Sequence, residues 1–350
     1  MTQRRLTMAA MVTALAAVPV HAHHAAPATF DTSQDMEIEG FVTNFSFVNP
    51  HVTIDLMVED DSGASREWVV TAPAVAGFRR WGWTEDTLEE GQYVRLVGRK
   101  ARHGGPMILL ERADIEGGSL LEIDPDDGSL VRVLTGPKPD QTPGDLVIPP
   151  LTLADGRPNL GGTWLAVEPG SGSRPAAAQF NASGQALQDA FDPTRDPAYT
   201  HCEPRSLVGD ITAIQSVRVT QSEDYVVLEY EGPGTRRLVY LDGREARSDE
   251  HTRLGHSVAR YDGDALVIET NQLLGGLTNG RGNALSDAMT LVETYRRADD
   301  ADNAALGMTV VITDPGHLAA PWELGWRKLQ THDYEFAAVN CRPPVLGNLR

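Results

Sequence analysis

Two-residue alternation of apolar and polar side chains marks most of the first third of the chain. This period is typical of strands that bury one face, and it is found in residues 35–48, 51–60, 66–72, 92–101 and 106–115. One stretch departs from it, because Pro73 stands where a helix would begin and Val75, Phe78 and Arg79 follow at helical spacing. Three strands, a short helix and two further strands are the element order of an OB-fold, a small closed Greek-key barrel. We therefore predict an OB-like barrel over residues 23–118.

The pattern changes in the middle of the chain and then returns to alternation. Residues 119–158 are rich in proline and show little periodicity, which predicts a linker. A short helix follows, with Asn181 or Ser183 as its N-cap. Short strands at similar spacing are then predicted at 213–221, 225–231, 236–243, 255–261, 264–270, 289–297, 307–314, 322–330 and 334–341.

These strands predict a second, larger domain over residues 159–350, an antiparallel β-barrel or sandwich. Its first residues include Gly-Gly-Thr-Trp at 161–164, which resembles the Gly-x-Trp start of lipocalin-like barrels. The fold class predicted for the whole chain is therefore mainly β, with an OB-like barrel followed by a lipocalin-like barrel or sandwich.

The first 22 residues have the pattern of an export signal. Arg4 and Arg5 give a positive start, an apolar, alanine-rich stretch follows, and Val20 and Ala22 suit a cleavage site. A retained N-terminal anchor is the alternative, but the apolar run is shorter than the roughly 20 residues that span a bilayer. We therefore predict cleavage after Ala22, a mature chain that begins at His23, and a periplasmic or secreted protein.

Cys202 and Cys341 are the two cysteines of the sequence. In an exported protein, an isolated pair is typical of one disulfide. A metal site built on both thiolates is the alternative, although the pair lacks Cys-x-x-Cys spacing. We predict a disulfide that ties the beginning of the second domain to its last strand.

The formal net charge of −19 changes which partners are expected. An acidic surface repels nucleic acid and anionic lipid, and no basic stripe offsets it. After the signal, no segment has the length and hydropathy of a membrane span. The sequence therefore predicts neither a nucleic-acid partner nor a membrane span, and it leaves a small-molecule ligand or substrate as the expected partner.

Short motifs along the chain carry a resemblance to known families. The first half contains His23–His24, Asn49–Pro50–His51 and RRWGWT at 79–84, and the second half contains YLDGRE, LGHSVARYDGDALVIET, VETYRR and ITDP. The first half resembles a family of exported bacterial proteins known only as a domain of unknown function, and the second half resembles further uncharacterised exported proteins. Two departures are the inserted Trp81 and Ala259–Arg260–Tyr261, where relatives carry Gly-Arg-Trp. The resemblance implies export and a two-domain plan, and it implies no reaction.

The clearest turn signal of the second domain is Asp262–Gly263. A hairpin loop of those two residues pairs Tyr261 with Asp264, and the same register places His256 opposite Glu269. The two strands therefore present a polar face that holds a histidine and a carboxylate together.

This polar face is a candidate catalytic cluster of His256, Glu269 and Arg260. A carboxylate that orients an imidazole supports general acid–base catalysis, and an adjacent arginine holds an anionic group. The alternative is a solvated cross-strand ion pair with a nearby arginine. The catalytic interpretation requires that this face line a barrel cavity. Elsewhere, Glu293 is expected to pair with Arg296 or Arg297.

The predicted N-terminus supplies a candidate metal site. Cleavage exposes an α-amine with a pKa of about 7.7–8.0, which loses its proton to a metal near neutral pH. The amine and the His23 ring then chelate one ion, His24 adds a second imidazole, and His51 is the best candidate for a third nitrogen, with His103 in reserve. Nitrogen-rich, tetragonal sites favour Cu(II), so the predicted cofactor is copper. The alternative is that His23 and His24 fray in solvent, as termini usually do.

Two classes of function follow from these features. One is an exported binding protein, with copper at the mature N-terminus and a small molecule in the C-terminal barrel. The other is a periplasmic hydrolase, lyase or isomerase that uses His256 and Glu269 in a barrel cavity. The sequence has no nucleophile elbow, dinucleotide fingerprint, phosphate loop or His-Glu-x-x-His motif, which favours binding and leaves enzymatic activity open.

Overall fold

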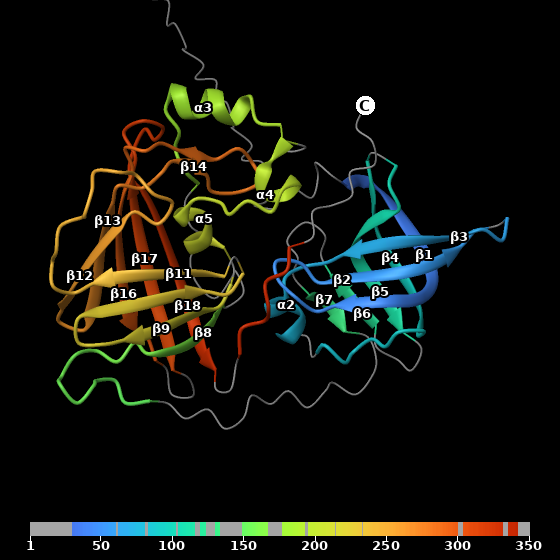
Figure 1. Ribbon diagram of the computed structural model, residues 1–350, viewed down its shortest axis with the longest axis horizontal. Helices are drawn as coiled ribbons and strands as arrows, with labels where there is room; N and C mark the ends of the chain where they lie inside the picture. Colours follow the sequence, from blue (N-terminus) through green and yellow to red (C-terminus); the bar gives the residue numbers. More distant parts are fainter. Residues whose placement is uncertain are drawn as a thin grey trace, which may run out of the picture.

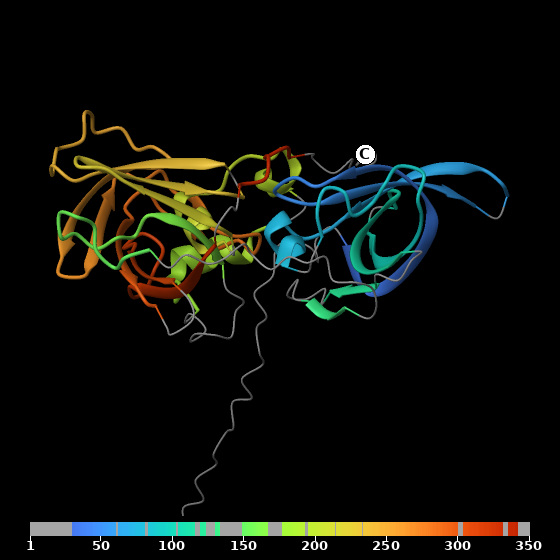
Figure 2. The same ribbon diagram turned by 90° about the horizontal axis from the view of Figure 1, so that it is seen from below.

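The computed structural model describes residues 30–60, 62–80, 83–102, 104–115, 120–123, 130–133, 149–166, 177–192, 195–213, 215–232, 234–299, 304–331 and 335–341. They form mainly β structure, arranged as two barrels that lie side by side (Figures 1 and 2). This confirms the predicted fold class. The predicted signal peptide, residues 1–22, and Trp81 lie outside the described residues. Among the residues described, no helix has both the length and the apolar character needed to cross a membrane.

The first barrel, drawn in blue and teal, has the strand order of an OB-fold (Figure 1). Its elements are β1 (Phe30–Ser46), β2 (Thr53–Glu59), β3 (Ser65–Thr71), α2 (Val75–Arg80), β4 (Tyr93–Ala101) and β5 (Met107–Ile115). The strands are ordered β3-β2-β1-β4-β5, and a parallel pairing of β3 with β5 closes the ring. Alternate residues such as Ile54, Leu56 and Leu96 are fully buried in its core, as the period of two predicts.

The stretch predicted to be a linker begins with two short strands. β6 (Leu120–Ile123) pairs with β5, and β7 (Leu130–Val133) pairs with β6. Leu121 is buried in the core of the first barrel, so these strands extend that barrel. A strand of four residues is too short to show a clear period, and the proline-rich composition around it hid the signal.

The second barrel is closed by nine strands of the described chain. They are β8 (Gly162–Ala166), β9 (Val217–Gln221), β10 (Tyr225–Tyr230), β11 (Thr235–Tyr240), β12 (His256–Asp262), β13 (Ala265–Asn271), β16 (Thr290–Arg297), β17 (Ala305–Thr313) and β18 (Trp322–Thr331). They follow chain order around the ring, and β18 returns to pair with β8. In a closed ring with an odd number of strands, neighbouring strands cannot all be antiparallel to each other. The exception is the parallel pair of β11 and β12, which meet through Tyr240 and Val258.

The connection from β8 to β9 covers one end of the second barrel (Figure 1). It contains α3 (Ala182–Asp189), α4 (Pro197–Thr200) and α5 (Leu207–Thr212), and a small hairpin of β14 (Gly276–Leu277) and β15 (Ala284–Leu285) contacts α3. Asn181 is the N-cap of α3, because its side chain accepts hydrogen bonds from the backbone of Ser183 and Gly184. Leu207, Val208 and Ile211 of α5 belong to the barrel core, so apolar side chains close this end.

The hairpin of β12 and β13 does not have the predicted register. Asp262 pairs with Ala265, so the two-residue loop is Gly263–Asp264 and not Asp262–Gly263. Gly263 has a φ of +59°, and a type II′ turn places glycine at its first central position. The prediction was wrong because the Asp-Gly signal assumes that glycine is the second residue of the loop, whereas here it is the first.

Residues 335–341 do not form the ninth barrel strand that alternation predicts at 334–341. β8 takes that place, and residues 335–341 form an extended segment between the two barrels, drawn in red in Figures 1 and 2, which we call the strap. Alternation failed here because the strap contacts two barrels in place of one sheet. Cys341 at its end is bonded to Cys202, with 5.9 Å between the Cα atoms, which confirms the predicted disulfide.

Candidate functional site

His51 lies at the surface of the first barrel, in the turn between β1 and β2. The turn is held in place by Asn49, which is buried and accepts a hydrogen bond from the Val75 N–H at 3.3 Å. On the other side of the histidine, Val52 accepts a hydrogen bond from the Ala72 N–H at 2.9 Å. The backbone around His51 is therefore fixed against the segment that joins β3 to α2.

One hydrogen bond orients the His51 ring, whose Nδ1 lies 3.1 Å from the carbonyl oxygen of Ala72. A carbonyl oxygen only accepts, so Nδ1 carries the proton and Nε2 keeps its lone pair. Desolvation by the surrounding protein lowers the pKa of His51, which favours the neutral ring, while the side chain still reaches solvent. A neutral imidazole that donates its other N–H to a backbone carbonyl is the usual arrangement of a metal-binding histidine.

The start of β1 lies near the same end of the barrel. Phe30 packs with Ala101 and Met107 in a small cluster, and Val69 of β3 packs against it. Val69 precedes Ala72 by three positions, a separation of about 10 Å along a strand. His24 precedes Phe30 by six positions, and an extended chain of that length spans up to about 20 Å. The chain length therefore allows the predicted N-terminal ligands to reach His51.

The remaining predicted metal ligands, His23 and His24, and the reserve His103 lie outside the described residues, so their placement stays a prediction. Within the part of the chain that the structure describes, no group of three or more histidine, cysteine or acidic side chains is arranged to hold a metal. His51 alone offers one nitrogen. A metal site at this position needs its other ligands from the segments that are not described.

The His256 face of the second barrel points outward. Arg260 and Glu269 form an ion pair of 2.5 Å, and their side chains are 60% and 54% exposed. His256 stacks on Tyr240 with 5.8 Å between ring centroids, and its Nε2 lies 2.8 Å from the Arg244 carbonyl oxygen. The structure thus brings Arg260 and Glu269 together at the surface and holds His256 apart, against the loop that precedes β12.

The corrected register explains this separation. His256 pairs with Asn271, and Glu269 pairs with Val258, so the expectation that His256 faces Glu269 is wrong. The shift moves each partner by two residues and leaves the same side chains on each face. Because Arg260 and Glu269 extend into solvent, the enclosure that the catalytic interpretation requires is not present around them. Their catalytic role and that of His256 stay predictions.

A charged pair that the sequence analysis missed lies inside the second barrel. Arg237 of β11 donates to both carboxylate oxygens of Glu293 of β16, at 2.8 and 3.1 Å, and both side chains are fully buried. Arg237 also donates to the hydroxyls of Ser257 and Thr270, and the Tyr295 hydroxyl donates to Glu293 at 2.9 Å. The donors and acceptors of the pair are matched by their neighbours, which is what a buried ion pair needs to persist.

Glu293 therefore pairs with neither Arg296 nor Arg297, contrary to expectation. Arg296 follows on the opposite face of the strand, where it pairs with Asp264 at 3.2 Å. Arg297 lies at the end of β16, where it pairs with Asp299 at 2.5 Å and stacks over Trp164. The signal that the sequence did contain is the period of two, which puts Glu293 on the buried face of β16.

Side chains fill the interior of the second barrel. Trp164, Tyr230 and Tyr295 are fully buried among its aliphatic residues, and burial raises the pKa of Tyr230 to about 12. Two open hollows lie on the outside: one at 86–92 on the first barrel, and one beside Arg157 on the second. A small-molecule site within the second barrel therefore stays a prediction.

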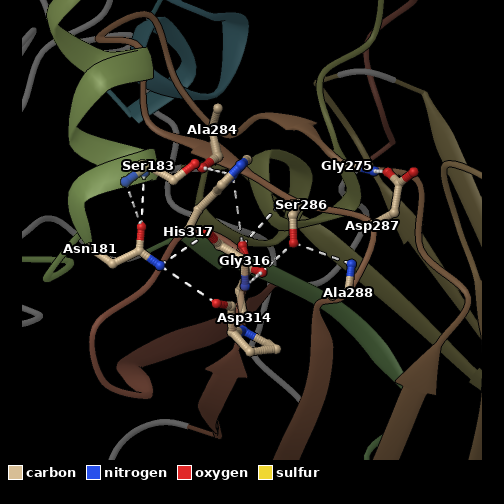
Figure 3. A network of polar contacts seen from close by, with 12 residues as sticks. Asn181, Ser183, Gly275, Ala284, Ser286, Asp287, Ala288, Asp314, Gly316 and His317 are labelled. Atoms are coloured by element: carbon tan, nitrogen blue, oxygen red, sulfur yellow. Dashed lines mark hydrogen bonds and ion pairs between the residues drawn. The ribbon is translucent and has the colours of Figure 1, made fainter.

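A polar network near α3 contains the residue types of a catalytic triad (Figure 3). Asp314 is buried and accepts hydrogen bonds from the hydroxyl of Ser286, from the Ser286 N–H at 2.8 Å and from the Gly316 N–H at 3.0 Å. His317 directs Nδ1 to the Ala284 carbonyl at 3.1 Å and stands 4.0 Å from Asp314. Ser286 therefore donates its hydroxyl hydrogen bond to Asp314 and not to His317. The network holds neighbouring loops together and lacks the hydrogen bond between nucleophile and base that a catalytic triad needs.

The comparisons with known proteins concern the first barrel. Residues 11–108 match the model of a family described as "Family of unknown function (DUF6152)". The match ends within β5 and includes the turn that carries His51. Neither the curated proteins nor the solved structures contain a match to the chain. Residues 11–108 therefore carry a domain of an uncharacterised family, in agreement with the resemblance inferred from the motifs.

Proposed function

We propose that this protein is an exported copper-binding protein, in which the mature N-terminus and His51 of the first barrel hold one ion. The observation that supports the proposal most is the state of the His51 ring. It is exposed, its Nδ1–H donates a hydrogen bond to the Ala72 carbonyl, and desolvation lowers its pKa. A ring in this state offers a free Nε2 at neutral pH without first having to lose a proton.

The proposed ligands are the α-amine and ring of His23, the ring of His24 and Nε2 of His51. This set contains only nitrogen donors, which suit Cu(II) in tetragonal geometry and place it ahead of the other divalent first-row metals. The formal net charge of −19 adds a general attraction for cations. Phe30 is anchored near β3, and the six positions that separate it from His24 are long enough for an extended chain to reach His51.

Export is part of the proposal, because cleavage is what creates the free amine of His23. The Cys202–Cys341 disulfide supports it, since disulfides persist in the periplasm and outside the cell and are rare in the cytosol. No ligand role is proposed for the second barrel, whose described interior is packed with side chains. The small-molecule partner stays a prediction from the sequence.

The proposal is tested by comparing two histidine variants of the mature chain, His51→Ala and His251→Ala. His251 is a matched control, because it is also exposed and its Nδ1 lies 3.0 Å from a backbone carbonyl, that of Leu273. Calorimetric titration with Cu(II) should show affinity reduced about tenfold or more by His51→Ala, or at least ~1.4 kcal/mol, and no change with His251→Ala. Equal affinities for the two variants would remove His51 from the site.

A further inference from the structure

The strap is hydrogen-bonded to the first barrel two residues before His51. The Asn49 N–H donates to the Ala338 carbonyl at 2.9 Å, and the Asn340 N–H donates to the Asn49 carbonyl at 2.9 Å. These bonds make Asn49 and Val339 a parallel β-bridge. The strap thus adds one short rung of backbone pairing to the turn between β1 and β2.

Further contacts show that the strap belongs to both barrels. Arg79 of α2 donates from Nη1 to the Glu335 carbonyl at 2.6 Å. The side chain of Ala337 packs against the first core, while its backbone N–H donates to Glu231 of the second barrel at 3.1 Å. One residue of the strap therefore contacts the two domains at once.

A cation–π contact and the disulfide also fix the strap to the second barrel. Arg218 of β9 lies over the Phe336 ring at 4.3 Å, and Cys341 is covalently bonded to Cys202. Cys202 has a φ of +59°, a left-handed backbone conformation that non-glycine residues adopt at a cost. When the disulfide is reduced, the backbone of Cys202 can relax from this conformation. This relaxation favours the reduced state, in which the strap is released, over re-formation of the disulfide.

The regular backbone pairing of the strap with the first barrel is limited to one bridge, between Asn49 and Val339. The strap contains no helix and no ladder beyond the single bridge, and most of its described side chains are partly or fully exposed. A segment with few buried contacts has low local stability. The disulfide raises the effective concentration of the strap at its binding positions, because it holds Cys341 beside Cys202 in a closed loop.

We propose that the Cys202–Cys341 disulfide is a redox latch that couples the two barrels through the strap. In the oxidised protein the strap stays paired with Asn49 and the barrels move together. In the reduced protein the strap leaves Asn49 and the barrels move independently. The latch does not depend on copper, and it acts on the turn that carries His51.

The reductant is a dithiol, and both cysteines are partly exposed to it. Its thiolate attacks one sulfur, the S–S bond breaks, and a mixed disulfide forms together with one free cysteine thiolate. The second thiolate of the reductant resolves the mixed disulfide. Two electrons and two protons pass to Cys202 and Cys341, and the reductant leaves as a disulfide.

Hydrogen exchange followed by mass spectrometry tests the latch on the full mature chain without metal, before and after treatment with dithiothreitol. Peptides that contain Asn49 should exchange at least tenfold faster after reduction. Peptides from β10, whose Val226 and Leu228 are fully buried, should exchange as before. Unchanged exchange at Asn49 overturns the proposal. An equal increase in exchange in β10 also overturns it, because it would mean that the disulfide stabilises the whole fold.

Two variants separate the latch from other effects of the reductant. Cys341→Ser should reproduce fast exchange at Asn49 without any reductant. Asn340→Pro keeps the disulfide and removes the N–H that donates to the Asn49 carbonyl, so it should raise exchange at Asn49 in the oxidised protein. If Cys341→Ser leaves Asn49 as protected as in the wild type, the latch does not exist.

Discussion

Two arginine–glutamate pairs of the second barrel are alike in chemistry and differ in burial. Arg237 and Glu293 are 1% and 0% exposed, whereas Arg260 and Glu269 are more than half exposed. Water solvates the second pair whether or not it is formed, so that pair contributes little. The first pair has no water to replace a missing partner, so each member depends on the other.

At the residue scale, we therefore predict opposite outcomes for the same substitution at these two glutamates. Glu293→Gln leaves Arg237 charged and buried, and it should lower the free energy of unfolding by about 3–5 kcal/mol. Glu269→Gln should lower it by less than about 1 kcal/mol. Urea denaturation of both variants measures the difference. Similar losses in the two variants would mean that the Arg237 site is hydrated.

At the scale of the element, the hairpin of β12 and β13 depends on glycines at both ends of β12. Gly263 has a φ of +59° with open space around it, and Gly255 has a φ of +62° with the Asn271 carbonyl and the Leu273 side chain against it. A methyl group added at Gly263 causes only backbone strain, because no atom lies near it. A methyl group added at Gly255 causes the same strain and also collides with the Asn271 carbonyl oxygen.

Gly263→Ala should therefore lower the free energy of unfolding by about 1–2 kcal/mol, the cost of a left-handed alanine. Gly255→Ala should lower it further, because the Asn271 carbonyl belongs to the partner strand and cannot move without breaking the ladder. Thermal unfolding of the two variants gives the order. If Gly263→Ala were the more damaging change, the turn assignment at Gly263–Asp264 would be incorrect.

Alternation predicted most of the long strands, and it could not predict which segment pairs with each of them. The order of an OB-fold follows from the spacing of apolar residues up to Ile115, and the same spacing locates β9 to β13 and β16 to β18. The loop of β12 and β13 was misplaced because Asp262–Gly263–Asp264 offers two possible two-residue turns. The strap was misread because the apolar run at 336–339 suits a strand, although its partners lie in two domains.

The candidate site shows the same limit. The sequence selects His51 by its motif, but the carbonyl that accepts the orienting hydrogen bond is that of Ala72, which follows β2 and β3 in the chain. Glu293 was paired with near neighbours, whereas its partner Arg237 lies 56 positions away. Contacts between distant strands depend on register, which the pattern of one strand does not contain.

At the scale of the whole molecule, the proposal requires that the chain be exported and cleaved. Intact-mass measurement of periplasmic material should give a chain that begins at His23, because Val20 and Ala22 suit the cleavage site. The same spectrum should show the mass of one disulfide, from Cys202 and Cys341. A mass that includes residues 1–22 would remove the free amine and with it the proposed copper site.

The most direct measurement is a copper titration of correctly cleaved protein beside the same protein with its α-amine acetylated. Acetylation removes the amine as a nitrogen donor and leaves the rings of His23, His24 and His51 in place. We predict one Cu(II) per cleaved chain and an affinity that falls about tenfold or more, or at least ~1.4 kcal/mol, in the acetylated chain. Unchanged stoichiometry and affinity in the acetylated chain would show that the amine of His23 is not a ligand.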